Sequence, residues 1–534
     1  MKINRIVIHN FKSIKDINLK LNPDLNVIVG NNETGKSTII EAIYLALSGT
    51  FQGKKIIHEI SPFIFNQDFT KEYIAALIAG ESPQIPISFI ELYLDEQEDN
   101  APLRGTNNTL KENSPGLKII IEFNEDYKDE YAKYIEDPTL ITTIPTEYYK
   151  SSWFSFANKA ITRRSIPLNS TLIDTTTIRL QYGSDFYMQK IINDQLDSKE
   201  KSELSLQYRK LKESFSDQES IQAINKKLKE DKGLISEKDL KVSIDISSKT
   251  SWEANLTSYL NDIPYQYIGK GEQSILKMLL ALERKGDTND IILIEEPENH
   301  LSFSNMNYLL RKINEKCSEK QLIITTHSPF VANKLGLDKL IIIGPDQSIT
   351  RLNELDSSTQ NYFKKISGYD TLRFVLAKTS ILVEGPSDEL AVQKAYMLKN
   401  EGKLPIEDSI DVITVRGLSF KRFLAIAKLT KSDVRVVTDN DGDFAKNITT
   451  KYDEYKGVAT IRIHASETNE LPTLEPQIVA SNDLVSCNLV LGKEFETEGE
   501  LLHWMSTNKT ESALLFFDYQ EAINFPQYIN DAIT

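Results

Sequence analysis

The chain has 534 residues and a formal net charge of −15 at pH 7, a length that predicts roughly two to four domains. Its acidity argues against indiscriminate coating of nucleic acid, although a local basic groove remains compatible with it because binding follows the local field. The sequence has two cysteines, Cys317 and Cys487, and no apolar run near the roughly 20 residues of a membrane span, so it predicts a cytoplasmic protein without a disulfide framework, zinc cluster or membrane contact.

The first chemical motif follows a strand pattern at residues 25–29. Gly30-Asn-Asn-Glu-Thr-Gly-Lys-Ser37 has the G-x-x-x-x-G-K-[ST] spacing and leads into an apolar helical pattern. Its glycines let backbone N–H groups surround phosphate oxygens, and the helix N-terminus adds its positive dipole end. Lys36 is predicted to reach the β- and γ-phosphates, and Ser37 to bind Mg²⁺. A flexible glycine-rich turn is the competing interpretation. The predicted nucleotide-binding residues are Asn31, Asn32, Glu33, Thr34, Gly35, Lys36, Ser37 and Thr38.

Residues 199–232 carry apolar side chains at helix-face spacing, in two successive phases. The first phase comprises Leu204, Tyr208, Leu211 and Phe215. This pattern predicts helices, and a helical hairpin packed on its own lobe is the plainest interpretation.

Three further patterns lie between residues 267 and 335. Gly269-Lys-Gly271 opens an apolar helical pattern, a buried-strand pattern ends in Glu295 and Glu296, and a later strand pattern ends at His327. In a nucleotide enzyme, the first of two such acids holds Mg²⁺ and the second orients the attacking water. A lone histidine at a strand end is usually structural, but its order and spacing after Glu296 favour a role in the site.

Acidic residues end two strand patterns in the last third of the chain. Glu384 ends the first, with Asp388 four residues on, and Asp439 and Asp441 end the second. Strand-end carboxylates separated by a helix-containing crossover can lie side by side in a parallel sheet. Two ionised carboxylates about 4 Å apart repel by about 4 kcal/mol at an effective dielectric near 20, so converging acids need divalent cations. Ordinary solvated turns are the competing interpretation.

The N-terminal motifs together resemble the ABC-type ATPases, in the branch that contains the SMC and RecF proteins. This resemblance implies that Gly269 and Gly271 lie in the signature loop, which contacts ATP held by another copy of the chain. It also implies that Glu296 is the catalytic glutamate and His327 the γ-phosphate switch. Glu295 stands where aspartate is usual and Gly269 where serine is usual, which predicts ATP binding with slow turnover.

Glu-Gly-x-Ser-Asp followed by Asp-x-Asp resembles the Toprim signature of topoisomerases, primases and some nucleases. The whole chain is most similar to the OLD family, in which an ABC ATPase precedes a Toprim nuclease; this family includes the Gabija nuclease subunit and nucleases encoded beside retrons. The implied fold is α/β, with an ABC-type ATPase domain, a helical insertion and a Toprim domain. The expected segments are ATPase at 1–150, a dimerising helical insertion at 151–248, ATPase at 249–350, a linker at 351–374 and Toprim at 375–534.

The resemblance assigns Mg²⁺ or Mn²⁺ binding in the Toprim domain to Glu384, Asp388, Asp439, Asp441 and Glu475. It also makes Lys509 the candidate for stabilising charge on the scissile phosphate. Two metals about 4 Å apart could generate hydroxide and stabilise the leaving oxygen. Residues 416–431 contain five basic residues and no acid. They predict either a phosphate-tracking edge, led by Arg416, Lys421 and Arg422, or a solvated helix face.

These motifs predict an ATP-binding, divalent-metal-dependent DNA endonuclease or nickase that is at least a dimer. The family resemblance implies antiphage defence, with a retron reverse transcriptase and its DNA or RNA, or a helicase subunit, as a partner. The alternatives are an SMC-like structural ATPase with a non-catalytic Toprim domain and an RNA-cleaving nuclease. The presence of all the main Toprim acids and the lack of long coiled-coil patterns favour a nuclease over the structural ATPase.

Overall fold

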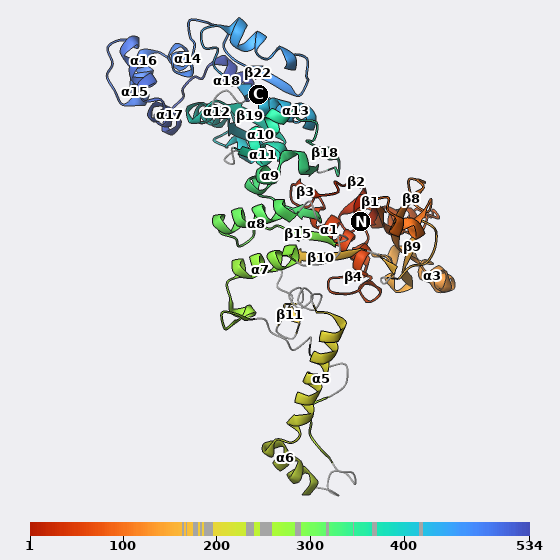
Figure 1. Ribbon diagram of the computed structural model, residues 1–534. Coiled ribbons are helices and arrows are strands. Elements are labelled where there is room, and N and C mark those ends of the chain that lie inside the picture. The colour runs from red at the N-terminus through yellow and green to blue at the C-terminus, as the bar shows by residue number, and fades with distance from the viewer. Residues whose placement is uncertain are drawn as a thin grey trace. The chain divides into compact units, whose positions relative to one another are not determined.

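Figure 1 shows the computed structural model of the protein. Two compact units are present: Met1–Asn26 with Gly35–Thr326, and Val27–Thr34 with His327–Thr534. Among the described residues, no helix is both long and apolar enough to cross a membrane. The structure describes residues 1–162, 165–166, 168–174, 180–181, 184–185, 196–230, 240–245, 252, 259–283, 290–316, 320–344, 346–365, 371–415 and 420–534.

The first unit contains an antiparallel sheet in the order β2-β1-β6-β8-β7, with β9 also pairing with β8. Two of its strands, β2 and most of β8, alternate buried and more exposed residues, as expected when one face of a sheet packs on a core. In chain order the strands are β1 (Ile3–Phe11), β2 (Ile14–Lys20), β6 (Ser88–Leu94), β7 (Arg104–Gly105), β8 (Ser114–Phe123) and β9 (Tyr149–Ser155).

Three parallel strands form a second sheet region in the first unit. The strand β15 (Asp290–Glu295) lies between β10 (Asn169–Asp174) and β16 (Gln321–Thr325). Their buried apolar runs are typical of strands covered on both faces. The accompanying helices are α1 (Lys36–Ser48), α7 (Lys270–Glu283) and α8 (Phe303–Lys316).

The buried side chain of Gln321 links β16 to the N-terminal segment by hydrogen bonds. Its Nε2 donates to the carbonyl oxygens of Ile3 and Asn22, both at 2.8 Å, and its Oε1 accepts from the Ile3 N–H at 2.8 Å. Residues 318 positions apart in the chain are thereby joined.

The segment expected to be a helical insertion, 151–248, begins with strands instead. The strand β9 continues the antiparallel sheet and β10 pairs with β15, so the helical part narrows to α5 (Ser198–Phe215) and α6 (Glu219–Glu230). The strand β10 is short and surrounded by serine and threonine, so its local sequence shows little strand periodicity; its partner across the sheet decides its conformation.

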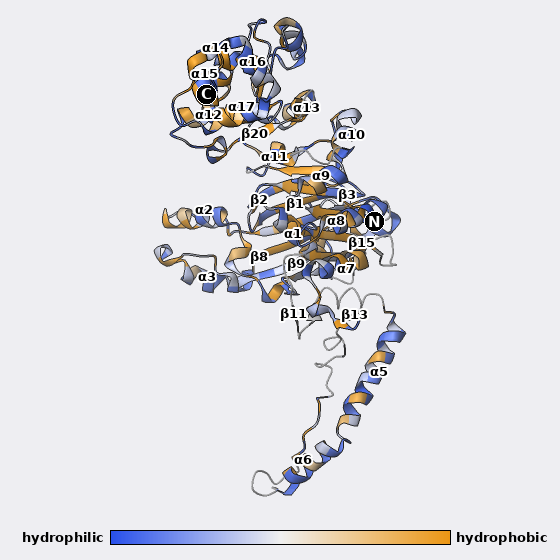
Figure 2. Ribbon diagram, turned by 90° about the vertical axis from the view of Figure 1, so that its left-hand side faces the viewer, coloured by the Kyte–Doolittle hydropathy of each residue, from blue (hydrophilic) through white to orange (hydrophobic). Residues whose placement is uncertain are grey.

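The helix α5 begins at a capping box made by Asp197 and Glu200. It carries apolar residues among polar ones along its length (Figure 2), and the Leu211 side chain is 65% exposed. Two contacts join it to later segments: Trp252 Nε1 donates to Ser205 Oγ at 2.8 Å, and Lys212 Nζ donates to the Asp245 carbonyl at 3.0 Å.

The second unit contains a four-stranded parallel sheet in the order β20-β19-β21-β22. Because its crossovers are helical and its strands parallel, the carboxyl ends of all four strands lie along one edge. Its elements include β19 (Thr379–Val383), α12 (Pro386–Lys399), β20 (Ile410–Thr414), α13 (Phe420–Thr430), β21 (Asp433–Val437) and β22 (Ile461–His464). Helices α14 (Leu474–Ser481), α15 (Leu484–Leu491), α16 (Glu498–Thr507), α17 (Lys509–Asp518) and α18 (Gln527–Ala532) follow.

The segment expected to be a linker, 351–374, is folded and packed where the structure describes it. It contains α10 (Ser357–Lys365) and most of α11 (Thr371–Leu376). The fully buried rings of Phe363 and Phe374 each meet Phe423 of α13 edge-on at 5.2 Å. Before it, β17 (Leu340–Ile343) pairs with β3 (Leu25–Gly30) in parallel and with β18 (Ile349–Arg351) in antiparallel.

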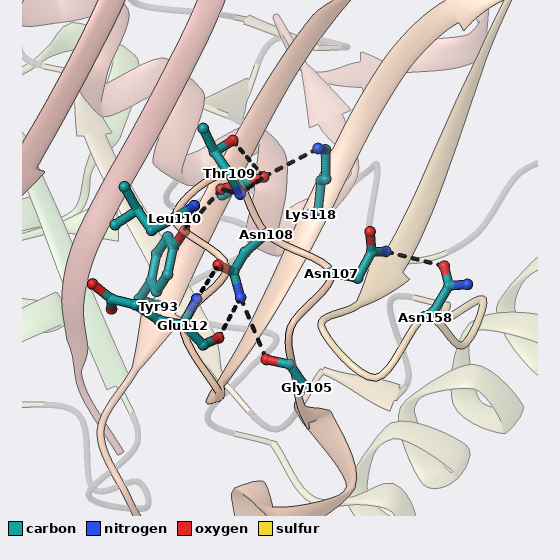
Figure 3. A network of polar contacts seen from close by, with 10 residues as sticks. Tyr93, Gly105, Asn107, Asn108, Thr109, Leu110, Glu112, Lys118 and Asn158 are labelled. Atoms are coloured by element: carbon teal, nitrogen blue, oxygen red, sulfur yellow. Dashed lines mark hydrogen bonds and ion pairs between the residues drawn. The ribbon is translucent and has the colours of Figure 1, made fainter.

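A fully buried carboxylate, Glu91 on β6, organises one loop of the first unit, and Figure 3 labels its partners Tyr93, Thr109 and Lys118. Lys118 Nζ lies 3.1 Å from its Oε1, and the N–H and hydroxyl of Thr109 each donate to it at 3.0 Å. The Tyr93 hydroxyl donates to Oε2 at 3.0 Å. Because every partner is in place, the buried charge is compensated and the loop before β8 is held to the sheet.

Glu91→Ala is expected to destabilise the first unit by about 3–5 kcal/mol, because it leaves the partly buried Lys118 ammonium and the donors of Thr109 and Tyr93 without their acceptor. Urea unfolding followed by circular dichroism would measure the change. Glu112→Ala is the matched control: its ion pair with Arg5 is half-exposed, so its loss should cost less than about 1 kcal/mol. Equal losses in the two variants would contradict a special role for the buried carboxylate.

Candidate functional site

The phosphate-binding motif forms the turn between β3 and α1. Gly35 adopts a φ of 92°, in the left-handed region that favours glycine, and a Cβ on Gly30 would lie 2.6 Å from Thr34 Oγ1. The Thr34 hydroxyl donates to the Asn31 carbonyl at 2.9 Å, which closes the turn. The helix α1, described in full, has neither a side-chain N-cap nor an acidic residue in its first turn. Its N-terminus therefore suits an anion.

The predicted nucleotide-binding residues differ in exposure along this turn. Thr34, Gly35, Lys36 and Thr38 are buried, and Asn31, Asn32, Glu33 and Ser37 are exposed. Burial lowers the pKa of Lys36, and the charge of Glu296 acts in the opposite direction. The two predicted ATP-site charges are therefore close enough to interact.

Glu296 stands directly after β15 in a strained conformation. Its φ is 45°, which is uncommon for a residue with a side chain, and its N–H donates to the Thr325 carbonyl at 3.0 Å. Its Oε2 accepts from Asn299 Nδ2 at 2.8 Å. Glu295 is the last residue of β15, so both acids of the predicted pair lie at the carboxyl end of a central strand. Strained residues of this kind gather at functional sites.

The two glycines of the predicted signature loop have different surroundings. A Cβ on Gly271 would lie 2.2 Å from the His300 carbonyl oxygen, so only glycine fits there without a shift. A Cβ on Gly269 would meet nothing within 4 Å, and the position has room for the serine that is usual in the family. His327 is exposed and begins the main segment of the second unit, just before α9 (Pro329–Leu335).

In the second unit, the predicted metal ligands lie at the carboxyl ends of β19 and β21. Leu382 pairs with Val436, so Glu384 and Asp439 follow neighbouring strand ends. Thr438 Oγ1 donates to Glu384 Oε1 at 2.6 Å, and the Asp439 N–H approaches the same oxygen at 3.4 Å.

The other predicted acids approach this edge from helices and a turn. Asp388 lies in the first turn of α12, where its Oδ2 accepts from the Gly385 N–H at 3.0 Å. Glu475 is buried at the start of α14 and pairs with Lys509 at 3.1 Å. Asp441 is exposed, with a φ of 48°.

Burial and mutual repulsion dominate the electrostatics of this acidic cluster. Burial and then the charges of Asp388, Glu384, Glu475 and Asp441 raise the pKa of Asp439 to about 8. Burial and then the charge of Glu384 raise the pKa of Asp388 to about 7. Burial acts to lower the pKa of Lys509, but the charge of Glu475 outweighs it and the net direction is upward.

Tyr528 of α18 is a neighbour that the sequence analysis did not identify. Its ring is buried, and burial followed by the charges of Asp439, Asp388, Glu384 and Glu475 raises its pKa well above the usual value. No sequence motif marks it, because it lies about 90 residues after the Asp-x-Asp pattern.

The donor chemistry of the cluster fits a divalent cation, because buried oxygen ligands that repel one another are stabilised by positive charge. The present side-chain positions are not those of a closed coordination shell. Among the described residues, no three His, Cys, Asp or Glu side chains surround a common ion position. Asp388 instead caps its own helix, and Glu475 pairs with Lys509. The predicted ligands share one sheet edge, and metal binding would require some of them to leave these partners.

The raised pKa values predict that the metal-free second unit loses stability as pH rises. Both aspartates have folded-state pKa values above the ordinary 3.8, so the native protein binds more protons than the unfolded chain between about pH 4 and pH 8. Their contribution to the free energy of unfolding is complete below pH 4 and is lost as pH passes 7 to 8. We expect the melting temperature without metal to fall over this range, and Mn²⁺ to raise it most at the alkaline end. The pH dependence should be shallower in Asp439→Asn, and a melting temperature that rises with pH would contradict the argument.

In the described part of the predicted basic edge, the basic side chains contact other groups of the protein. Lys421 pairs with Glu454 at 2.9 Å, and the Arg422 guanidinium stacks 4.5 Å from the centre of the Tyr362 ring. Arg422 also donates to the hydroxyl of Ser358 at 3.3 Å. Arg416 lies outside the described residues. Whether this segment is a phosphate-tracking edge or a solvated helix face stays a prediction.

Comparison with known proteins finds two family models in succession. Residues 1–332 match the model of the AAA ATPase domain, and residues 375–441 match the model of the "Overcoming lysogenization defect protein-like, TOPRIM domain". The OLD nuclease of Thermus scotoductus is 22% identical over 486 residues, which cover 82% of each chain. The DNA replication and repair protein RecF of Haemophilus ducreyi is 42% identical over 62 residues, which cover 11% of this chain and 17% of RecF.

Solved structures give alignments of low similarity. The SMC head bound to the C-winged helix domain of ScpA aligns with a TM-score of 0.37 and 15% identity, over 66% of this chain and 99% of that one. The ATP complex of RecF aligns with a TM-score of 0.35 and 11% identity, over 66% and 99%. TM-scores of this size do not establish a common fold.

The expected α/β fold class, with an ATPase domain followed by a Toprim domain, is confirmed by the two family models. The first model alone spans more than half of the chain, and the second begins in α11, just before the strand that leads to Glu384. The chain therefore belongs to the AAA ATPase domain family and, with the Toprim segment that follows, is an ATPase–Toprim protein of the OLD family.

Proposed function

We propose that the protein is an ATP-binding, divalent-metal-dependent DNA endonuclease or nickase. The observation that carries this proposal is the acidic cluster at the ends of β19 and β21, where burial and like charges raise the pKa of Asp439 to about 8. A cluster of this kind is held at neutral pH most readily by bound cations. The relative from Thermus scotoductus, which matches most of the chain, is named a nuclease.

Each site residue has a defined part in this proposal. Bound Mg²⁺ or Mn²⁺ would activate water and polarise the scissile phosphate. Lys509 lies beside Glu475 and is half-exposed, so its ammonium group is available to a phosphate at the edge of the cluster. The residues proposed to hold the metal are Glu384, Asp388, Asp439, Asp441 and Glu475.

At the nucleotide site, Lys36 would contact the phosphates, Ser37 and Glu295 would hold Mg²⁺ and Glu296 would orient water. ATP serves as a signal of conformation or dimer state, with slow turnover. Exposed aromatic rings near the signature loop support a contact with a second copy of the chain: Tyr267 is 73% exposed and Phe303 is 69% exposed. The exposed apolar residues of α5 offer further dimer surface. Antiphage defence, with a retron reverse transcriptase or a helicase subunit as partner, follows from family resemblance.

The decisive experiment incubates the purified protein with supercoiled plasmid and Mg²⁺ or Mn²⁺, with and without ATP. We expect nicked or linear DNA only when metal is present, and a change in rate with ATP. Matched single-stranded and double-stranded RNA would test the RNA-cleaving alternative. Unchanged plasmid at all metal and ATP concentrations would overturn the nuclease proposal.

One observation favours a second candidate, a structural ATPase with a non-catalytic Toprim domain. The engagement of Asp388 with its helix cap and of Glu475 with Lys509 leaves no three described acidic side chains around one ion. For that candidate, Mn²⁺ would neither bind to the acidic cluster nor raise the melting temperature.

A further inference from the structure

A threonine between β21 and the acidic pair makes a short hydrogen bond to a predicted metal ligand. The Thr438 hydroxyl donates to Glu384 Oε1 at 2.6 Å, and the side chain is 2% exposed. The Thr438 N–H donates to the His464 carbonyl at 3.2 Å, so the backbone is fixed against β22. A rigid strand end thus holds the donor, and water has little access to compete for the bond.

The same oxygen of Glu384 receives a second donor, the Asp439 N–H at 3.4 Å. Among the described residues, no hydrogen bond engages Oε2. Two donors on one oxygen restrict the rotation of the carboxylate plane, since a glutamate side chain otherwise has three freely rotating torsions. They also oppose the repulsion from neighbouring acids that would turn the group toward solvent.

A buried tyrosine lies near the threonine. Tyr452 is 4% exposed, and its hydroxyl lies beside the Thr438 hydroxyl without a hydrogen bond of ordinary geometry. The hydroxyl proton of Thr438 therefore has the Glu384 carboxylate as its acceptor.

We propose that Thr438 is a positioning residue that orients the Glu384 carboxylate for divalent metal. This inference rests on the proposed metal-dependent function, and it adds a residue that contributes no ligand of its own. Outer-shell donors of this kind fix the orientation of a ligand, and their loss typically lowers metal affinity or activity by about 10- to 100-fold. Serine at this position would keep the donor, whereas valine keeps the shape and removes it.

The test compares wild type with Thr438→Val, Thr438→Ser and a matched control, Thr371→Val. Thr371 is a buried threonine of α11 whose hydroxyl has no hydrogen-bond partner among the described residues. Mn²⁺ affinity would be measured without DNA by electron paramagnetic resonance, alongside the melting temperature of each variant. Plasmid cleavage would be measured as a function of both Mn²⁺ and DNA concentration.

We expect Thr438→Val to weaken Mn²⁺ binding about tenfold and to raise the Mn²⁺ concentration needed for half-maximal cleavage, with little change in KM for DNA. Thr438→Ser and Thr371→Val should behave like wild type in both measurements. Wild-type Mn²⁺ affinity in Thr438→Val would overturn the inference while leaving the nuclease proposal in place. Equal losses in the valine and serine variants would also overturn it, because the serine variant keeps the hydroxyl donor and should therefore keep its Mn²⁺ affinity.

Failure of the proposed function would look different. If the wild type cleaves no plasmid, the Mn²⁺ affinities still decide whether Thr438 orients a metal ligand. If Thr438→Val does not fold, Mn²⁺ affinity would be compared between Thr438→Ser, which keeps the hydroxyl, and Thr438→Ala, which loses it and has a smaller side chain.

Discussion

Replacing Asp439 with alanine is expected to abolish metal-dependent cleavage and leave ATP binding unchanged. Asp439 lies at the centre of the acidic cluster, since four neighbouring carboxylates act on its pKa. Removing a direct ligand should lower the cleavage rate by more than the 10- to 100-fold that is typical of outer-shell partners. Plasmid nicking and fluorescent-nucleotide binding on the same preparation would measure both effects.

The same substitution should raise the melting temperature of the metal-free protein near pH 8. Ionised Asp439 is unfavourable in the folded state there, because its pKa is raised far above the ordinary value of 3.8. Addition of Mn²⁺ should reverse the order and stabilise the wild type more. Asp443→Ala is the matched control, since this acid lies in the same turn but is exposed. Full nicking by Asp439→Ala would show that the acidic strand end is an ordinary solvated turn.

Lys36→Ala should remove measurable ATP binding. The lysine is 6% exposed, and burial lowers its pKa, so the folded protein accepts an unfavourable desolvation at this position. A cation kept in such a place is effective toward phosphate because little solvent screens it. Isothermal titration with ATP and Mg²⁺ would measure the loss.

Two further variants separate the roles at the nucleotide site. Lys54→Ala removes a lysine that is 71% exposed and should leave ATP affinity unchanged. Glu296→Gln should retain ATP binding and stop turnover, because the amide cannot accept a proton from water. Wild-type ATP affinity in Lys36→Ala would exclude the motif as the nucleotide site.

The parts of the site that the sequence predicted are those encoded by short, contiguous patterns. Gly30 to Ser37 requires a strand, a tight turn and a helix in immediate succession, and the structure has all three. Glu384 and Asp439 follow apolar strands whose parallel pairing could be anticipated from the helical crossover between them. In each case the local sequence determines both the element and the place of the functional group at its end.

Interactions between segments far apart in the chain could not be predicted from such local patterns. The sequence does not mark Thr438, because a hydroxyl next to an acid is common. Its proposed role depends on its hydrogen bond to Glu384, which comes from a distant strand end. For Arg422 the sequence left open a phosphate-tracking edge or a solvated helix face, and its contacts with Tyr362 and Ser358, in the segment expected to be a linker, could not be anticipated. The strand β10 has too little periodicity to be recognised, and its pairing with β15 determines it.

The contacts of Gln321 have a consequence for synthesis of the chain on the ribosome. Ile3 and Asn22 emerge early, yet the side chain that satisfies their backbone groups emerges about 300 residues later. At roughly 5–20 residues per second, this leaves the N-terminal strands incomplete for about 16–60 s. The parallel sheet of the second unit, by contrast, is assembled from strands within residues 379–464 and can close soon after it emerges. The nascent ATPase segment is therefore the part of the protein most exposed to aggregation, and its production should depend most on chaperones that shield apolar strands.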